Sequence, residues 1–333
     1  MKKLLIIGGA GFIGSNACYF FSKKNYKISV IDSLSYASNL NYIRPLIKDK
    51  IIKFDRINIS NYQKLNKHIN KLNPQIIINF AAESHVDNSI KSPDIFFKSN
   101  VSGVYNILLS IKNYNKKNKS NKIRFFQIST DEVYGSLEKG FANENYPLNP
   151  SSPYSSSKAA ADCLVMGMCK TYNIEYYISR CTNNFGPFQF PEKLVPLSIK
   201  KSLNNKPIEL YGDGKNKRDW IFVDDHIRAI YKIITKGKTN QIYNIGAQNT
   251  YTNLFISKKI LSILKDLKNK KIISKFNNTI LFIDDRPAHD FRYAVSTKKI
   301  MKDTNWSLKN NFEKNLYHTI LWYIAFFNKK TNE

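Results

Sequence analysis

Acidic residues, cysteines and long apolar runs are all scarce in this sequence. Its 333 residues include 25 Asp and Glu against 52 Lys and Arg, which gives a formal net charge of +27. The four cysteines form no Cys-x-x-Cys pair and show no zinc-like Cys/His spacing, so we expect no disulfide framework and no metal. No apolar stretch approaches the roughly 18 residues that cross a bilayer, so no membrane partner is expected either. The simplest compartment is the reducing cytoplasm.

The excess of positive charge raises the question of nucleic-acid binding, because Lys and Arg release counterions from phosphates. The lysines are, however, spread along the whole chain. Their densest cluster, residues 112–122, is predicted to be a solvated loop after a helix. We therefore expect no nucleic-acid partner, although part of the charge is expected to attract an anionic ligand by electrostatic steering.

Short apolar runs alternate with longer segments through the first half of the chain. They cover residues 4–7, 27–31, 51–54, 76–80, 124–128 and 176–179. This alternation predicts βαβ units and a doubly wound parallel α/β sheet of the Rossmann type. After about residue 180 the pattern loosens into loops rich in Gly, Pro and Asn, notably 183–196 and 211–220, which predicts a smaller C-terminal α/β substrate-binding lobe. We expect residues 1–180 in the Rossmann domain, and 181–333 mainly in the second lobe with some segments returning to the first.

A glycine-rich turn follows the first predicted strand. Gly8, Gly11 and Gly14 form Gly-x-x-Gly-x-x-Gly at the start of a helix predicted from Phe12, and such glycines let the backbone approach a pyrophosphate. Glycines at these positions are also compatible with a plain strand-to-helix turn. Asp32 ends the second predicted strand, where a carboxylate accepts hydrogen bonds from the adenosine ribose and repels a 2′-phosphate. Together these residues predict NAD, and not NADP, as the cofactor.

Two further patterns suggest chemistry on a hydroxyl group. Tyr154 and Lys158 lie four residues apart on a helix predicted to begin just after Pro153. A nearby ammonium, together with the positive nicotinamide ring of the cofactor, lowers the pKa of the phenol, so that it can take a hydroxyl proton as hydride leaves the same carbon. The adjacent acids Asp131 and Glu132 suggest elimination of water as well as redox chemistry, although such pairs also cap or solvate loops at strand ends.

Several motifs occur in one order over nearly the whole chain, at residues 8–16, 81–87, 183–187, 189–194, 211–216, 218–220 and 285–287. On these motifs the sequence resembles the extended short-chain dehydrogenase/reductase family. Thr130 matches the Ser or Thr that joins the Tyr and Lys of that family. The Asp131-Glu132 pair resembles the branch that dehydrates nucleotide sugars, because related epimerases and decarboxylases usually lack it.

The resemblance implies a three-stage reaction with NAD as a recycled cofactor: dTDP-glucose is oxidised at C4, loses water across C5 and C6, and is reduced at C6 by the NADH formed in the first stage. It implies catalytic roles for Thr130, Asp131, Glu132, Tyr154 and Lys158. Tyr154 would deprotonate the C4 hydroxyl, Glu132 would remove the C5 proton, and Asp131 would protonate the departing C6 hydroxyl. A neutral Asp131 beside an ionised Glu132 requires environments that separate the two carboxyl pKa values.

Two sets of binding residues are also implied by the resemblance. The cofactor set is Gly8, Gly11, Phe12, Ile13, Gly14, Asp32, Asn58, Ile59, Ala81, Ala82, Ser99, Tyr154, Lys158 and Asn184. The nucleotide-sugar set is Ser84, Thr130, Asn183, Lys193, Leu194, Leu210, Tyr211, Arg218, Asn253, Arg286 and His289. A homodimer is expected as well, through helices near Pro93–Ser110 and Tyr154–Thr171 that pack as a four-helix bundle.

Three positions depart from the family pattern. Asn58 replaces an acid near the adenine, but an amide still hydrogen-bonds to the base, and Ser99 takes a Thr position. Ala288 stands where Gly is usual, and it disfavours positive φ, so we expect a shift in the nucleotide-binding loop.

Two alternatives remain open at the level of sequence. One is a dehydratase or epimerase acting on another nucleotide sugar such as UDP-glucose, since base selectivity depends on few contacts. The remote one is a non-catalytic NAD-binding or basic scaffold protein. The five intact candidate catalytic residues argue against the scaffold, because a binding module does not need them.

Overall fold

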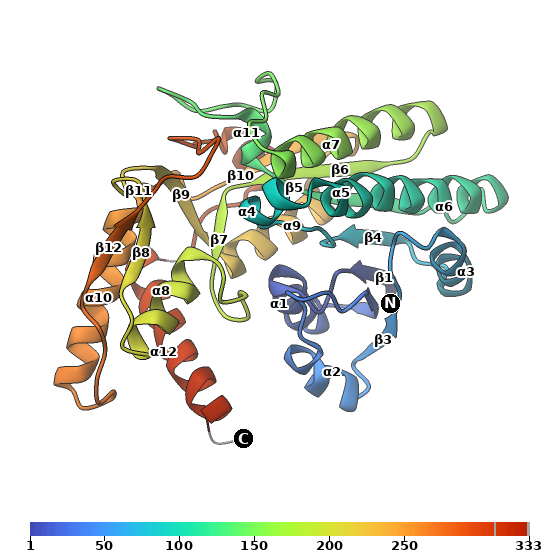
Figure 1. Ribbon diagram of the computed structural model, residues 1–333. Helices are drawn as coiled ribbons and strands as arrows, with labels where there is room; N and C mark the ends of the chain where they lie inside the picture. Colours follow the sequence, from blue (N-terminus) through green and yellow to red (C-terminus); the bar gives the residue numbers. More distant parts are fainter. Residues whose placement is uncertain (310, 332–333) are drawn as a thin grey trace.

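Seven parallel strands form the central sheet in the computed structural model, which describes residues 1–309 and 311–331 (Figure 1). Their order across the sheet is β10-β6-β5-β4-β1-β2-β3. The strands are β1 (Lys2–Ile7), β2 (Tyr26–Asp32), β3 (Ile52–Arg56), β4 (Ile76–Asn79), β5 (Arg124–Thr130), β6 (Tyr176–Cys181) and β10 (Gln241–Ile245). The strand order reverses between β1 and β4, which in doubly wound sheets opens a ligand crevice at the carboxyl ends. The predicted doubly wound fold and its six N-terminal strands are confirmed.

The sheet is buried on both faces, which explains why its strands are almost continuously apolar. Along β1, Leu4 and Ile6 belong to one apolar core, whereas Leu5 and Ile7 belong to another. This alternation follows from the two-residue period of a strand, whose side chains point to opposite faces in turn. Each fully buried Leu or Ile stabilises the fold by about 1.5–3 kcal/mol relative to an exposed one.

Helices cover the two faces (Figure 1). The first core is covered by α1 (Phe12–Ser22), α2 (Arg44–Lys48), α9 (Val223–Lys236) and α11 (Lys298–Thr304). The second is covered by α3 (Tyr62–Leu72), α6 (Gly103–Lys117) and α7 (Pro153–Tyr172). The loop predicted at residues 112–122 is wrong in its first part, because buried Ile111 and Tyr114 extend the amphipathic pattern of α6 to Lys117.

Short elements connect the sheet to the ends of these helices. They are η1 (Leu40–Tyr42), α4 (Val86–Lys91), α5 (Pro93–Phe96), the π-helical turn η2 (Phe97–Ser102) and η3 (Asp131–Tyr134). In the part of the chain that the structure describes, no helix is long and apolar enough to cross a membrane.

The second lobe has its own apolar core. It contains the sheet β11-β9-β7 and the pair β12-β8, with helices α8, α10 and α12 packed against them. The bounds are β7 (Asn183–Phe185), α8 (Leu194–Leu203), β8 (Ile208–Tyr211), β9 (Lys217–Phe222), β11 (Thr250–Thr252), α10 (Asn253–Asn269), β12 (Ile280–Ile283) and α12 (Phe312–Thr331). The loops predicted at 183–196 and 211–220 are therefore wrong in part, since β7, the start of α8 and the first four of the six residues of β9 lie there. Strands of three residues are too short to show an alternating pattern.

Candidate active site

A cavity of about 560 Å³ lies at the carboxyl ends of β1, β2, β4, β5 and β6. Every residue predicted to bind the cofactor and every residue predicted to be catalytic lines it. From the nucleotide-sugar set, the cavity is lined by Ser84, Thr130, Asn183 and Lys193. Leu194, Leu210, Tyr211, Arg218, Asn253, Arg286 and His289 do not line it. The structure thus separates the predicted residues into a cavity group and a neighbouring group.

The glycine turn has the form that a dinucleotide requires. Gly8 has φ +78°, and a Cβ on it would lie 2.5 Å from the Ala81 nitrogen, while a Cβ on Gly14 would lie 2.1 Å from the Gly8 oxygen. A Cβ on Gly11 would meet only the Gly8 oxygen, at 3.4 Å. Gly8 and Gly14 are therefore required by the chain's own packing, whereas Gly11 leaves the backbone open to the cavity. Helix α1 begins here without a side-chain cap, so its first amides face the site of an anion.

Asp32 is held in place at the opposite side of the turn. Its carboxylate accepts hydrogen bonds from the Ala10 amide at 2.9 Å, the Leu34 amide at 2.8 Å and the Ser38 hydroxyl at 3.0 Å. The side chain is buried and still lines the cavity. A carboxylate fixed in this way is suited to ribose hydroxyls, because its orientation costs no further entropy on binding.

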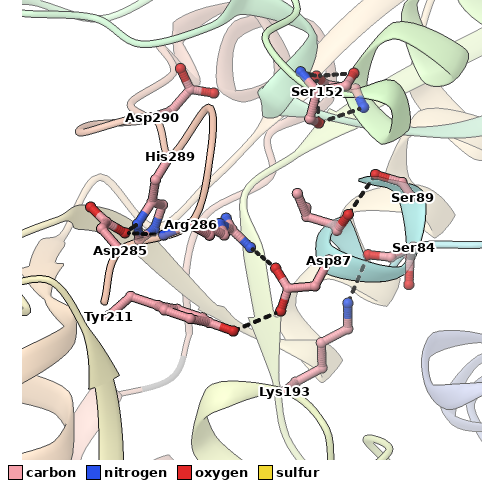
Figure 2. Close-up of polar contacts among 12 residues, drawn as sticks. Ser84, Asp87, Ser89, Ser152, Lys193, Tyr211, Asp285, Arg286, His289 and Asp290 are labelled. Atoms are coloured by element: carbon pink, nitrogen blue, oxygen red, sulfur yellow. Dashed lines mark hydrogen bonds and ion pairs between the residues drawn. The ribbon is translucent and has the colours of Figure 1, made fainter. Parts of the chain in front are cut away.

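Helix α7 positions Tyr154 and Lys158. Ser152 and Ser155 form a capping box at its start, and Pro153 lies in the first turn. Ser152 is labelled in Figure 2. The Lys158 ammonium donates a 2.6 Å hydrogen bond to the Ile128 carbonyl. The predicted helix start is confirmed.

Burial dominates the ionisation of the pair. It lowers the pKa of Lys158 to about 8, against an opposing effect of Asp162. It also raises the pKa of Tyr154, with a further increase from Glu132. The lowering of the phenol pKa that the sequence predicts also requires the positive ring of bound NAD, so it stays a prediction.

Asp131 and Glu132 lie directly after β5 in different environments. Burial, followed by the charges of Glu132 and Asp219, raises the pKa of Asp131 well above its usual value. The Thr130 hydroxyl donates to Asp131 Oδ1 at 3.3 Å, and Oδ2 is buried with no hydrogen-bond partner among the described residues. Burial also raises the pKa of Glu132, but the charges of three cations oppose it: Arg218, Arg286 and Lys193. Asp131 therefore has the stronger preference for its protonated form, and neither acid solvates an exposed loop.

Residues of the neighbouring group are joined by hydrogen bonds across the two lobes (Figure 2). Tyr211 donates to Asp87 Oδ2 at 2.9 Å, and Arg286 donates to Asp87 Oδ1 at 3.1 Å. Lys193 donates to the Ser84 carbonyl at 2.7 Å, and both of these residues line the cavity. Figure 2 shows Arg286 and Tyr211 converging on the same carboxylate.

Arg218 on β9 is not a surface ion-pair partner. It is buried, and it donates to the carbonyls of Asp290 at 2.7 Å and Phe291 at 3.1 Å, with its guanidinium 4.3 Å from the Tyr293 ring centre. Two other predicted residues serve the packing of the second lobe. Leu210 is buried in a small apolar core, and the Asn253 amide donates to the Asn216 carbonyl at 3.1 Å.

The loop that carries Arg286 and His289 contains Ala288, which has φ +53°. Alanine therefore adopts here the left-handed conformation that glycine adopts more easily. His289 is paired with Asp285 at 2.5 Å. The loop keeps its turn despite the missing glycine, at the expense of backbone strain.

Sequence reasoning missed two groups. His226 on α9 lines the cavity, contacts Asn184 Oδ1 at 2.9 Å through Nδ1, and has its pKa lowered by burial to about 3. Asp162, one turn after Lys158, forms a buried ion pair with Arg180 at 2.9 Å. A single histidine on a helix gives no sequence signal, whereas the four-residue spacing of Lys158 and Asp162 was a signal that could have been used. In the described ranges, no cluster of His, Cys, Asp and Glu is arranged to hold a metal ion.

Comparisons with known proteins agree with this geometry. The family model described as GDP-mannose 4,6 dehydratase matches residues 5–319. A dTDP-glucose 4,6-dehydratase of Neisseria gonorrhoeae is 41% identical over 97% of this chain and 96% of its own length.

Two solved structures are similar over nearly the whole chain. The dTDP-glucose 4,6-dehydratase of Bacillus anthracis in complex with NAD is 38% identical with a TM-score of 0.85, over 98% of this chain and 97% of that one. The Streptomyces venezuelae enzyme of the same name, with NAD and TYD bound, is 34% identical with a TM-score of 0.89, over 97% of both chains. The chain therefore belongs to the GDP-mannose 4,6 dehydratase family, in the dTDP-glucose 4,6-dehydratase branch of the extended short-chain dehydrogenases/reductases.

Proposed function

We propose that this protein converts dTDP-glucose to dTDP-4-keto-6-deoxyglucose and water, with NAD as a recycled cofactor. The observation that carries the proposal is that Asp131 and Glu132 share one cavity with Tyr154 and Lys158. Burial and two neighbouring carboxylates raise the pKa of Asp131 well above its usual value, whereas burial raises the pKa of Glu132 against the opposing charges of three cations. Elimination of water needs this combination, an acid for the leaving hydroxyl and a base for the carbon-bound proton.

The reaction begins at the C4 hydroxyl. The phenolate form of Tyr154, whose negative charge the Lys158 ammonium stabilises, takes the hydroxyl proton and becomes the neutral phenol. The Thr130 hydroxyl assists, because its hydrogen bond lowers the pKa of Tyr154. A ketone at C4 then makes the C5 proton acidic.

Elimination follows between C5 and C6. Glu132 removes the C5 proton, and Asp131 donates its proton to the C6 hydroxyl, which leaves as water. Glu132 returns a proton to C5 as C6 is reduced. The proton that Tyr154 took at the start restores Asp131, so the protein ends in its initial state.

The cavity-lining residues of the first 180 positions fit NAD. When bound, NAD supplies a hydride acceptor for C4, a hydride donor for C6 and a positive ring charge. The glycine turn would hold the pyrophosphate at the start of α1, Asp32 the adenosine ribose, and Asn58 the adenine. The rest of the set would complete the site: Phe12, Ile13, Ile59, Ala81, Ala82, Ser99, Tyr154, Lys158 and, from beyond position 180, Asn184.

The second lobe would hold the nucleotide. Arg218 and Arg286 would bind the diphosphate, because the planar guanidinium pairs with phosphate oxygens through two hydrogen bonds. Arg286 would have to leave Asp87 to do so. The sugar would contact Ser84, Thr130, Asn183 and Lys193, and the nucleoside would lie toward Leu194, Leu210, Tyr211, Asn253 and His289.

The test is a comparison of sugar nucleotides. The purified protein is incubated separately with dTDP-, UDP-, CDP- and GDP-glucose, and formation of the 4-keto chromophore in alkali is followed. We expect the highest kcat/KM with dTDP-glucose and no chromophore with a Tyr154→Phe variant. Faster turnover of UDP-glucose would reassign the substrate, and no turnover of any sugar by NAD-loaded protein would refute the proposal.

The protein would act as a homodimer in the cytoplasm. Phe97 and Tyr105 on the η2–α6 segment are exposed by 60% and 44%, as expected for apolar residues that a second copy covers together with α7. All four cysteines lie in the described ranges and are free thiols, which suits a reducing compartment. Sedimentation equilibrium should give twice the chain mass, and Phe97→Lys should reduce it to the monomer mass.

A further inference from the structure

Three segments that are far apart in the sequence meet beside the cavity through one side chain, Tyr36. Tyr36 lies in the loop after β2, Asn88 lies in α4, and Glu192 lies in the loop before α8. The Tyr36 hydroxyl donates to Glu192 Oε1 at 3.1 Å and accepts from Asn88 Nδ2 at 3.3 Å. The Tyr36 ring also packs edge-on against Phe190, with the ring centres 5.6 Å apart.

These contacts connect two walls of the cavity. Ser35 and Ala37, the chain neighbours of Tyr36, line the cavity on the side of Asp32. Phe190 and Glu192 line it on the side of the nucleotide-sugar lobe. Tyr36 itself is 49% exposed and does not line the cavity, so its hydrogen bonds bridge the two walls at the outer rim. Lys193, next to Glu192, makes a second bridge through the Ser84 carbonyl.

We propose that Tyr36, Asn88 and Glu192 form a clasp that retains the dinucleotide in the cavity between the two redox steps. The purpose of the clasp rests on the proposed function: a redox-neutral reaction returns the same electrons that it removes. If the reduced cofactor left early, it would strand a 4-keto sugar that cannot be reduced. The clasp connects the loop behind Asp32 to the loop that carries Lys193, so it has to open before the dinucleotide can leave.

The strength of such a clasp is limited. A hydrogen bond from a hydroxyl to a carboxylate is stronger than one between neutral groups, but this one lies at a half-exposed rim where water competes. A loss of about tenfold in residence time, equal to about 1.4 kcal/mol, is the scale that a single such bond supports. The clasp therefore slows escape without making the cofactor permanent.

The test measures escape of NADH directly. Protein loaded with NADH is mixed with a large excess of NAD, without sugar, and the decay of the bound NADH fluorescence gives the dissociation rate. Tyr36→Phe keeps the ring on Phe190 and removes the hydroxyl, and we expect it to raise the dissociation rate about five- to tenfold. Glu192→Ala, which removes the acceptor of this bond, should raise the rate similarly. In the double variant the effects should fall short of the product of the two single effects, because both changes break the same bond.

The matched control is Tyr62→Phe. Tyr62 lies on α3 outside the cavity lining, and its hydroxyl accepts a hydrogen bond from Asn113 on α6 at 2.8 Å. It should leave the NADH dissociation rate unchanged. If Tyr36→Phe also leaves the rate unchanged, or if the two single effects multiply fully in the double variant, the clasp is refuted. Should Tyr36→Phe fold poorly by its melting temperature, Asn88→Ala tests the same bridge from the third segment.

Failure of the clasp and failure of the proposed function can be told apart. Faster NADH loss in Tyr36→Phe, with no dehydration of any sugar by the unmodified protein, would support the clasp and refute the function. Normal dehydration by the unmodified protein, with an unchanged NADH dissociation rate in the variants, would support the function and refute the clasp.

Discussion

The cofactor half and the nucleotide half of this site are built in different ways. On the cofactor side the backbone supplies the binding surface, through the glycine turn at Gly8–Gly14 and the ends of parallel strands, and Asp32 is fixed by three hydrogen bonds. On the nucleotide side, long side chains from separate loops supply it. Arg286 and Tyr211 are already bonded there to Asp87.

This difference between a backbone surface and a set of long side chains predicts how each ligand binds. A preorganised backbone surface loses little conformational freedom when the cofactor enters, so little of the binding energy is spent on ordering the site. In the proposed binding mode, a diphosphate entering the nucleotide half would have to replace the Asp87 carboxylate at Arg286, and part of its binding energy would be spent on that exchange. We therefore expect a cofactor that stays and a nucleotide that exchanges quickly.

The largest expected effect concerns the two acids between these halves. Asp131→Asn removes the proton donor for the C6 hydroxyl, so water loss should fall by about 100- to 10,000-fold. Oxidation at C4 and solvent hydrogen exchange at C5 should survive better, because they depend on Tyr154 and Glu132. The measurement is deuterium incorporation at C5 beside chromophore formation, with the exposed Asp213→Asn as control. Dehydration at the native rate would remove Asp131 from its proposed role.

A pair of substitutions should separate the halves. Asp32→Ala should weaken NAD binding about 10- to 100-fold and leave dTDP affinity unchanged, because a charged hydrogen-bonding group is lost. Arg286→Ala should weaken dTDP binding about tenfold without affecting NAD, a smaller effect because Asp87 competes for the arginine. Calorimetric titration with each ligand tests both. If either variant lost affinity for both ligands equally, the two halves would not be independent.

The buried ammonium of Lys158 in the cofactor half should affect the free energy of unfolding. The pKa of Lys158 is lowered by burial from 10.5 to about 8, so the folded state binds fewer protons than the unfolded state between these values. The free energy of unfolding should therefore rise with pH across this window, and at pH 7 the buried ammonium destabilises the fold. Lys158→Met should stabilise the protein by about 1–3 kcal/mol at pH 7 and abolish C4 oxidation.

Urea unfolding at pH 7 and above pH 10.5 measures this gain. It should shrink at the higher pH, where the lysine is neutral in both states. A variant less stable than the parent at pH 7 would show that the Ile128 hydrogen bond outweighs the burial of charge.

The smallest expected effect lies in the nucleotide loop. Ala288→Gly relieves a positive φ that costs alanine about 1–2 kcal/mol, but it also adds freedom to the unfolded chain. We expect Ala288→Gly to raise the free energy of unfolding by about 0.5 kcal/mol, as measured by thermal unfolding. Ala288→Val should lower it by more than about 1 kcal/mol. Equal melting temperatures for the parent protein and the Ala288→Val variant would mean that the turn relaxes.

The predictability of the two halves differs for a physical reason. The glycine turn, Asp32 and the Tyr154–Lys158 pair are local patterns, so the sequence alone placed all of them correctly in one cavity. The Asp87–Arg286 pair joins residues that are 199 positions apart, and Tyr36 and Glu192 are 156 apart. No periodicity or motif encodes such pairs, because they arise only when the two lobes pack. The contact of His226 with Asn184 escaped prediction for the same reason, whereas the three-residue β7 is too short to show an alternating pattern.

Strand β10 has a consequence for the synthesis of the protein. It is made of residues 241–245 and pairs with β6, which ends at residue 181. During translation the ribosome must therefore add about sixty more residues before the edge of β6 finds its partner. Until then an unpaired, apolar strand edge is open to other nascent chains, which is the usual route to aggregation. A protein truncated after residue 180 should therefore form inclusion bodies. The two lobes have to be expressed together for the sheet to be completed.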